Sequence, residues 1–327
     1  MPPREPRDPM QILVTEQVDE AGLELLRRAH QVAVALTQDP AELRRLIADA
    51  DAIIVKGSTR LSAEVLMQAP RLKAIGRVGN GLDNIDLAYA SAHQIMVFNS
   101  PEGSVAAVAE FAIMQMLALC RRAYEVHRAW LGRDYRRGRF LGCELRSRRV
   151  GIIGYGRIGS EVAQLLRAFN CQRAAWDTDL EARRRAEERG VATAASLDEL
   201  MGRCDLLSLH VPLTQDTREL INARRLRLAP RGVLLLNLAR GGLIDEAALL
   251  EAIRDGHVAA AAIDVLAKEP SYDVEPSQQR YANALLDEPR VILTPHLAAS
   301  TYEAQRTMSV AVAQQLIHHL KKAVVMA

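Results

Sequence analysis

The chain has 327 residues, 49% of them hydrophobic and 25% charged, which is the composition of a globular protein with room for two domains. A formal net charge of only +2 and an aromatic content of 4% argue against nucleic acid as a partner. The four cysteines contain no CxxC pair and are typical of reduced thiols, so we expect a cytoplasmic protein.

The N-terminal third of the chain is predicted to form an α/β domain. Residues 1–9 mix prolines with both charge signs and lack the apolar segment of a signal peptide, so we expect a disordered tail there. Helical spacing is found at 19–29, 39–49 and 62–70. Short apolar runs predict the strands of this domain at 11–15, 32–36, 52–56, 72–77 and 95–99.

A long apolar segment at residues 105–120 follows a natural domain boundary near residues 99–103. It contains Glu110 and Gln115 and is short for a membrane span, so a buried or interface helix is the better interpretation and no membrane partner is expected. The segment from residue 298 to about 322 is also helical, and we expect it to return to the first domain.

The part of the chain between these helices alternates apolar runs with charged helical segments such as 159–170 and 245–256. Continuous apolar runs are typical of strands buried on both faces, and a βαβ series predicts a parallel, doubly wound sheet. The predicted domains are therefore 103–297, and 10–102 together with 298–327. The predicted strands of the larger domain lie at 150–154, 173–177, 205–212, 232–239, 259–265 and 290–296.

Three glycines, Gly154, Gly156 and Gly159, stand directly after a predicted strand and open a predicted helix. This is the context in which GxGxxG binds a dinucleotide, because the helix N-terminus then presents free N–H groups to the pyrophosphate. Asp177 ends the next strand, where a carboxylate accepts hydrogen bonds from the ribose hydroxyls and repels a 2′-phosphate. The residues that follow it include no adjacent arginine, so NAD is favoured over NADP. The alternative is a glycine turn and a solvated aspartate in a protein that binds no nucleotide.

Polar side chains follow three later strands: Arg240, the pair Asp264 and Glu269, and His296. Ligands of open α/β sheets bind beyond the carboxyl ends of the strands, so one crevice can collect these residues. Taken singly, each has a structural explanation, as an ion-paired arginine, a solvated acid or a core histidine. Their joint position downstream of a dinucleotide motif favours catalysis.

The motifs that carry these residues resemble those of the NAD-dependent D-isomer-specific 2-hydroxyacid dehydrogenases, and within that family the catalytic part of the phosphoglycerate-oxidising enzymes. The resemblance implies a Rossmann-type doubly wound NAD-binding domain and a second, flavodoxin-like α/β substrate-binding domain. The matching motifs are GRVGNGLDNIDL (76–87), GIIGYGRIG (151–159), HVPLTQDTRELIN (210–222), NLARGGLIDEAAL (237–249), AAIDVLAKEP (261–270) and TPHLAASTYEA (294–304).

The resemblance also implies the catalytic roles. His296 is the acid/base for the substrate oxygen, Glu269 hydrogen-bonds its imidazole, and Arg240 holds the carboxylate and carbonyl of a 2-oxo acid. Further cofactor contacts are implied for Arg157, Ile158, His210, Val211, Pro212, Thr217, Leu238, Ala239, Asp264 and Ala298, the last of these standing where the family usually has glycine. Substrate binding is implied for Lys56, Gly57, Arg77, Gly79, Asn80 and Gly81, beside Arg240 and His296.

The expected partner is a small anionic 2-hydroxy or 2-oxo acid, with 3-phosphoglycerate and phosphohydroxypyruvate first. Lys56 and Gly57 replace the Arg-Ser that commonly opens the substrate loop, which keeps open hydroxypyruvate or glyoxylate, a branched or aromatic 2-oxo acid, or a phosphonate. Arg60, Arg77 and the basic run at 133–139 would suit a second anionic group or form a solvated face. No metal is expected.

Three further expectations concern the whole protein. The family forms dimers through its nucleotide-binding domain, so we expect a homodimer. A non-catalytic, NAD-sensing protein similar to the corepressors built on this fold is the alternative class. The segment at 271–289 is longer than the usual connection and either covers the site or lies on the surface, and feedback by serine through a C-terminal regulatory domain is not expected because the chain ends soon after its last helix.

Overall fold

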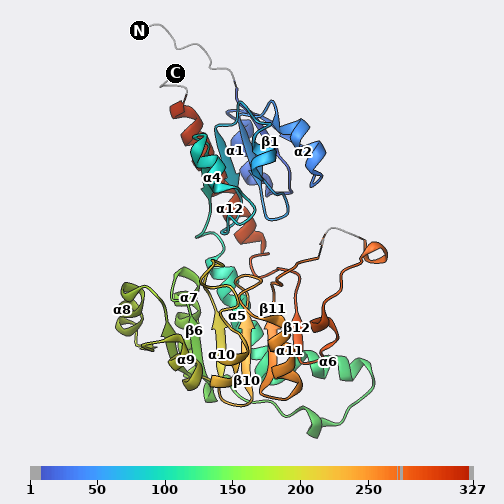
Figure 1. Ribbon diagram of the computed structural model, residues 1–327, viewed down its shortest axis with the longest axis vertical. Helices are drawn as coiled ribbons and strands as arrows, with labels where there is room; N and C mark the ends of the chain where they lie inside the picture. The colour runs from blue at the N-terminus through green and yellow to red at the C-terminus, as the bar shows by residue number, and fades with distance from the viewer. Residues whose placement is uncertain (1–8, 271, 273–274, 324–327) are drawn as a thin grey trace. The chain divides into compact units, whose positions relative to one another are not determined.

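The chain divides into two compact units in the computed structural model shown in Figure 1, Met1–Val105 with Ala299–Ala327, and Ala106–Ala298. The predicted domain boundaries lay after residues 102 and 297. The structure describes residues 9–270, 272 and 275–323, so the predicted disordered tail at 1–9 lies outside the described residues except for its last position.

The first unit is built on a parallel five-stranded sheet in the order β2-β1-β3-β4-β5, which is the flavodoxin-like order. The central strand β3 is buried along its whole length, whereas the edge strand β2 is largely exposed. The chain changes direction between β1 and β3, and ligands bind at such a switch point. The strands are β1 (Gln11–Val14), β2 (Gln31–Val34), β3 (Ala52–Val55), β4 (Ala74–Arg77) and β5 (Met96–Asn99).

The helices of the first unit begin where the sequence supplies capping residues. Asp19 and Asp39 are the N-caps of α1 and α2, and each accepts a hydrogen bond from an amide of the first turn. The C-terminal helix packs against α1, where the Asp19 amide donates to Ser309 Oγ (3.1 Å), so this segment returns to the first unit as expected. The helices are α1 (Glu20–Arg27), α2 (Pro40–Ile47), α3 (Ala63–Leu66), α4 (Leu87–Ala92) and α12 (Tyr302–Ala323).

The second unit is built on a parallel seven-stranded sheet in the order β12-β11-β10-β9-β6-β7-β8. The doubly wound parallel sheet predicted for this part of the chain is confirmed, with the change of direction between β6 and β9; the short β8 was not predicted. The strands are β6 (Arg149–Ile153), β7 (Gln172–Trp176), β8 (Ala192–Thr193), β9 (Leu206–Leu209), β10 (Val233–Asn237), β11 (Val258–Ile263) and β12 (Val291–Leu293).

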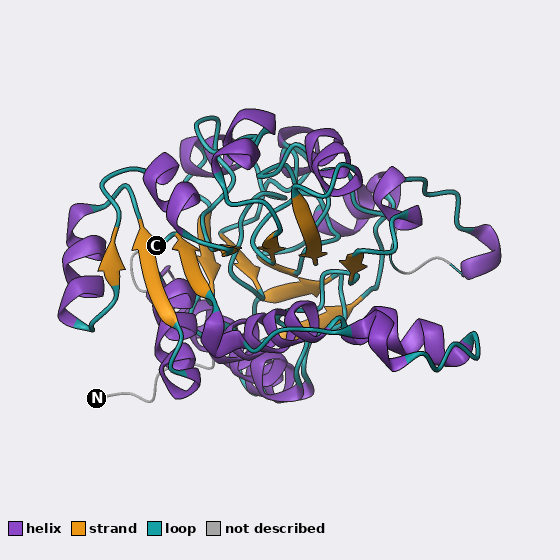
Figure 2. Ribbon diagram, turned by 90° about the horizontal axis from the view of Figure 1, so that it is seen from below, coloured by secondary structure: helices purple, strands orange, loops and turns teal. Residues whose placement is uncertain are grey.

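Helices lie on both sides of these strands, as Figure 2 shows. Leu200, Leu226 and Leu249 of α9, α10 and α11 join the strands in one core, while α5 passes behind β10 and β11 in the view of Figure 1. No helix among the described residues is long and apolar enough to cross a membrane. The helices are α5 (Val105–Arg121), which begins at the boundary between the units, α6 (Ala123–Leu131), α7 (Arg157–Leu165), α8 (Leu180–Glu188), α9 (Leu197–Arg203), α10 (Ala223–Leu228) and α11 (Glu246–Arg254).

The contact between α1 and α12 predicts a specific cost for enlarging Gly22. A Cβ at this position would lie 2.8 Å from the carbonyl oxygen of Ser309, so Gly22→Ala forces the two helices apart. We expect a loss of about 1–3 kcal/mol in the free energy of unfolding, measured by urea denaturation. The matched control is Gly202→Ala in α9, where the nearest contact would be an ordinary 3.7 Å and the change gains up to about 1 kcal/mol of helix propensity. Equal behaviour of the two variants would contradict this packing.

Candidate active site

The glycine turn between β6 and α7 is shaped by close backbone contacts. Gly154 has φ +94°, and a Cβ there would lie 2.7 Å from the carbonyl oxygen of His210, which follows β9. A Cβ at Gly159 would lie 2.0 Å from the carbonyl oxygen of Gly154, whereas one at Gly156 would meet nothing within 4 Å. The turn is therefore tight on the protein side and open at Gly156, the N-cap of α7, where a pyrophosphate would approach the helix N-terminus.

Asp177 directly follows β7 and is tied to the same turn. Its Oδ2 accepts a hydrogen bond from the amide of Tyr155 (2.7 Å) and its Oδ1 accepts one from the amide of Asp179 (2.9 Å). These bonds hold the half-buried carboxylate beside the glycine turn, as a ribose-binding acid requires. Although no arginine is adjacent in sequence, the Arg183 guanidinium reaches back to the backbone carbonyl of Asp177 (2.5 Å).

The segment after β9 forms the other side of the turn. Burial lowers the pKa of His210 to about 4, so its imidazole is neutral near pH 7, and its Nε2 lies 2.8 Å from Ser208 Oγ. Thr217 Oγ1 donates to the carbonyl oxygen of Pro212 (2.7 Å) and accepts from the amide of Thr214, which fixes the loop.

The remaining predicted cofactor residues occupy neighbouring positions of the same unit. Arg157 and Ile158 are the first residues of α7, and Val211 Cγ1 would lie 2.8 Å from a Cβ at Gly154. Leu238 and Ala239 follow β10, and Ala298 is buried in the loop after β12. These residues all follow the carboxyl ends of strands or begin the helix that follows one.

Arg240 lies at the end of a rigid turn after β10. Asn237, which is 2% exposed, accepts from the amide of Ala239 (3.1 Å) and donates through Nδ2 to the carbonyl oxygen of Arg240 (2.9 Å). This explains the single polar residue within the apolar run, because its amide side chain shapes the turn. The Arg240 guanidinium donates to the carbonyl oxygen of Ala239 (2.7 Å).

His296 and Glu269 form an ion pair after the neighbouring strands β12 and β11. His296 Nδ1 lies 3.0 Å from Glu269 Oε1 and 3.3 Å from Oε2. Their side chains are 42% and 31% exposed, so the ion pair contributes little to the stability of the fold. Its main effect is to orient the imidazole ring. With Nδ1 facing Glu269, Nε2 is the nitrogen available for proton exchange with a substrate.

Asp264 fixes the loop that carries His296. This carboxylate is 1% exposed and accepts hydrogen bonds from Thr294 Oγ1, from the amide of Leu297 (2.9 Å) and from the amide of Ala298 (2.9 Å). The amide of His296 donates to the backbone carbonyl of Asp264, and His296 itself has the left-handed φ of +54°. Asp264, for which the family resemblance implies a cofactor contact, therefore also has a structural role.

In the first unit, Arg77 and the glycine loop after β4 lie together. The Arg77 guanidinium covers Gly79, whose Cβ would lie 1.5 Å from Nη1, and it also lies next to Gly57. Ser100 and Asn99 anchor the loop through bonds to Gly79 and to the carbonyl oxygen of Asn80. Among the described residues, the amides of Asn80 and Gly81 have no protein acceptor, so both can donate to an anion.

The loop that contains Lys56 and Gly57 is held by Glu16, a residue that sequence analysis missed. The Glu16 carboxylate follows β1 and accepts hydrogen bonds from the amides of Lys56 (2.7 Å), Ser58 and Thr59. Asn84 Nδ2 donates to the carbonyl oxygens of Lys56 and Thr59. Both lie far from the loop in sequence, and the only available signal was the position of Glu16 at the switch point between β1 and β3.

The basic run at 133–139 is partly neutralised within itself. Arg136 and Arg139 both form ion pairs with Asp134, and these arginines lower the pKa of its carboxyl group. Trp130 and Tyr135 form an edge-on ring contact (4.6 Å between centroids) in the same exposed segment. Within the first unit, Arg77 is the basic side chain that lies against the predicted substrate loops of Gly57 and Gly79.

Comparisons with known proteins agree with this geometry. The family model described as D-isomer specific 2-hydroxyacid dehydrogenase, NAD binding domain, matches residues 113–298. The chain belongs to the D-isomer specific 2-hydroxyacid dehydrogenase family, and the predictions of this family and of an NAD-binding domain are confirmed.

The individual relatives differ in their substrates. The D-3-phosphoglycerate dehydrogenase of Archaeoglobus fulgidus is 39% identical over 313 residues, covering 95% of this chain and 58% of that protein. The chain thus spans a little over half the length of the curated relatives it matches. Among solved structures, the D-lactate dehydrogenase of Aquifex aeolicus with NAD and lactic acid has a TM-score of 0.86 at 28% identity, with 96% of each chain covered. A glyoxylate reductase of Paecilomyes thermophila has a TM-score of 0.83 at 28% identity, with 97% of each covered.

The environment of Asp177 predicts how cofactor choice can be changed. Asp177→Ser removes the ribose-binding carboxylate and leaves Arg183 at the same backbone position. We expect kcat/KM with NADH to fall about tenfold or more, the effect of losing a hydrogen bond to a charged group, while kcat/KM with NADPH rises. The control is Asp179→Ser, which changes the neighbouring acid and keeps an N-cap residue on α8. An unchanged NADH to NADPH ratio in Asp177→Ser would remove Asp177 from cofactor selection.

Proposed function

We propose that this protein is an NAD-dependent dehydrogenase that interconverts a D-2-hydroxy acid and its 2-oxo acid. The observation that carries the proposal is the His296–Glu269 pair, presented on the same sheet edge as Arg240 and the open glycine turn. NAD supplies or accepts the hydride when it is bound, and the residues of the chain position the substrate and move the proton.

The proton transfer follows from the orientation of the imidazole. Glu269 accepts the hydrogen bond from Nδ1 and holds the ring so that Nε2 can give its proton to the substrate oxygen during reduction. In oxidation, the neutral ring takes the hydroxyl proton through the same nitrogen. The orientation also requires Asp264, whose three hydrogen bonds hold the loop that presents His296.

Substrate binding is assigned to groups that each unit presents by itself. In the second unit, Arg240 pairs with the carboxylate and carbonyl oxygens of the 2-oxo acid, for which a guanidinium has a matching fork of donors. In the first unit, the amides of Asn80 and Gly81 can donate to an anion, and Arg77, next to Gly57 and Gly79, supplies a positive charge. This charge, together with the names of the most similar curated relatives, supports 3-phosphoglycerate and phosphohydroxypyruvate as the substrate pair.

Hydroxypyruvate or glyoxylate is the second candidate. The solved glyoxylate reductase supports it, as does Lys56-Gly57 in the loop held by Glu16, since lysine offers a single charge and not a bidentate fork. The four free cysteines support a cytoplasmic location for either reaction.

A panel of 2-oxo acids tests the function directly. We expect NADH oxidation with phosphohydroxypyruvate to exceed that with hydroxypyruvate, glyoxylate, pyruvate and larger 2-oxo acids. His296→Ala should lower turnover by at least about 100-fold, the usual contribution of a general acid, while NADH binding measured by fluorescence stays unchanged. Unchanged turnover in this variant would remove His296 from the mechanism. Tight NADH binding with no turnover on any 2-oxo acid would favour the non-catalytic, NAD-sensing alternative.

We also propose a homodimer formed through α6 and the turn η1 (Arg137–Phe140) that follows it, which project from the second unit in Figures 1 and 2. A self-complementary apolar surface of this kind fits a second copy of the chain. Its exposed apolar side chains, together with two of α5, are Met114, Leu117, Tyr124, Val126, Trp130, Leu131 and Leu141.

Charging this surface should separate the dimer. Trp130→Glu combined with Leu131→Glu places two carboxylates on side chains that are 63% and 69% exposed in the single chain. Size exclusion with light scattering is expected to give a dimer for the wild type and a monomer for the double variant. The control is Tyr302→Glu, an exposed aromatic of the first unit, which should leave the dimer intact. A wild-type monomer at micromolar concentration would overturn the proposal.

A further inference from the structure

The loop that carries Glu269 is held by side chains from outside the predicted site. Glu246, the first residue of α11, accepts a hydrogen bond from the amide of Ala267 through Oε1 (2.6 Å). Tyr281 donates its hydroxyl to the carbonyl oxygen of Lys268 (2.6 Å). The two residues that directly precede Glu269 are therefore each fixed through their backbone.

Asn283 joins these two anchors. Its Nδ2 donates to Glu246 Oε2 (2.9 Å) and lies 3.1 Å from the hydroxyl oxygen of Tyr281. Its Oδ1 accepts from the amide of Leu285, which is 1% exposed and part of the core of the second unit. The Asn283 side chain thus links Leu285 of the core to Glu246 and Tyr281, the two residues that hold the Glu269 loop.

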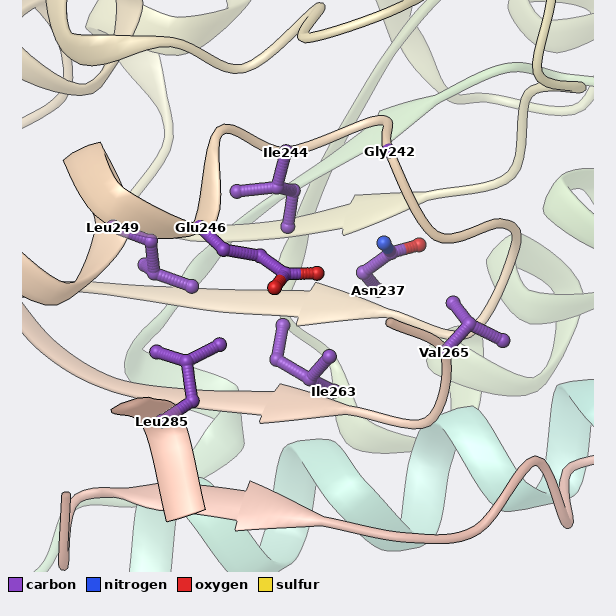
Figure 3. Close-up of a pocket in the computed structure, with 8 residues that line it drawn as sticks. All are labelled: Asn237, Gly242, Ile244, Glu246, Leu249, Ile263, Val265 and Leu285. Atoms are coloured by element: carbon purple, nitrogen blue, oxygen red, sulfur yellow. The ribbon is translucent and has the colours of Figure 1, made fainter. Parts of the chain in front are cut away.

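The surroundings of Glu246 favour these bonds. Figure 3 shows its half-buried carboxylate among apolar side chains and facing Asn237, and the pocket is lined by Asn237 together with Ile244, Leu249, Ile263, Val265 and Leu285. A carboxylate against an apolar wall is costly unless donors meet it, and here the donors are the Ala267 amide and Asn283. Glu246 therefore holds its position only together with the loop and the segment that it binds.

Tyr272 contacts Glu269 from the longer segment between the two catalytic residues. Its hydroxyl hydrogen-bonds to the Glu269 carboxylate. Burial and the nearby carboxylates of Glu269 and Asp264 raise the pKa of Tyr272, so the phenol stays protonated and acts as the donor. The carboxylates of Glu269 and Asp264 and the phenol of Tyr281 are the titratable groups that act on Tyr272.

We propose that Glu246, Asn283 and Tyr281 form a positioning network that holds the carboxylate of Glu269 against the imidazole of His296. The inference rests on the function proposed above, since it assigns these residues to the same proton transfer. It gives the segment at 271–289 a role in the reaction, and it makes Tyr281 a positioning residue that touches neither substrate nor cofactor.

The decisive variant is Tyr281→Phe, which removes one hydroxyl and keeps the ring. We expect kcat for reduction to fall about three- to tenfold, the effect of losing one hydrogen bond, while the KM of the substrate and the Kd of NADH stay unchanged. Glu246→Gln and Asn283→Ala should change the same quantities, and Tyr302→Phe, 92% exposed, should change none.

A double-mutant cycle separates positioning from a general loss of structure. In a Glu269→Gln background, Tyr281→Phe should have little further effect on kcat, because both changes act through the same carboxylate. An equally large effect in both backgrounds, or a fall in NADH affinity, would overturn the proposal.

A spectroscopic readout keeps the network testable apart from turnover. In 15N-histidine-labelled protein, the His296 Nδ1 resonance should change in Tyr281→Phe and in Glu246→Gln, because both variants loosen the hydrogen bond between Nδ1 and Glu269, and it should not change in Tyr302→Phe. If no 2-oxo acid is reduced, the proposed function fails, but this measurement still tests the network. An identical Nδ1 resonance in all four proteins would show that the network does not position Glu269.

Discussion

The buried carboxylate of Asp264 is the constraint on which the site depends. At 1% exposure it has no access to water, and the donors that satisfy it are Thr294 Oγ1 and the amides of Leu297 and Ala298. All three belong to the loop after β12. Any other loop conformation would leave this carboxylate with too few donors, and the loop accordingly carries His296 at a positive φ that an unconstrained histidine rarely adopts.

The parallel sheet explains why the loop that Asp264 fixes lies beside the other residues of the site. Strands β10, β11 and β12 are neighbours with the same direction, so Arg240, Asp264 and His296 leave the sheet at one edge. The glycine turn and His210 leave the same edge on either side of the switch point between β6 and β9. Close backbone contacts join Gly154 to His210 and Gly241 to Leu266, and a hydrogen bond joins Ala298 to Asp264, so these loops form a preorganised edge.

These features could be predicted from sequence because each one is local. An apolar run marks its strand, three glycines mark a tight turn, and the residue after a strand is placed at the sheet edge by the direction of the chain. The Glu269–His296 pair was available only through the family resemblance, since 27 residues separate the two and no spacing rule connects them.

The residues that hold the loops of the site in place could not be predicted either, because their hydrogen-bond partners also lie far away in the sequence. Glu16 binds amides about 40 residues away, and Glu246 binds one 21 residues away. A glutamate after a strand or in the first turn of a helix has an ordinary local explanation, as a solvated acid or as a partner of the helix dipole. Only the folded chain shows that these carboxylates meet backbone donors of functional loops.

The distribution of positive charge shows why the choice of substrate is harder to predict from sequence than the class of reaction. Arg136 and Arg139 share one acid, Asp134, within the same segment, so their charges are partly cancelled before any ligand arrives. The Arg77 guanidinium instead covers the loop of Gly79 and lies next to Gly57. A count of basic residues therefore overstates the field that a substrate would meet. The proposed reaction needs only a hydride carrier, one proton donor and one carboxylate clamp, whereas the choice among 2-oxo acids depends on which cations the surrounding loops place beside the substrate-binding amides.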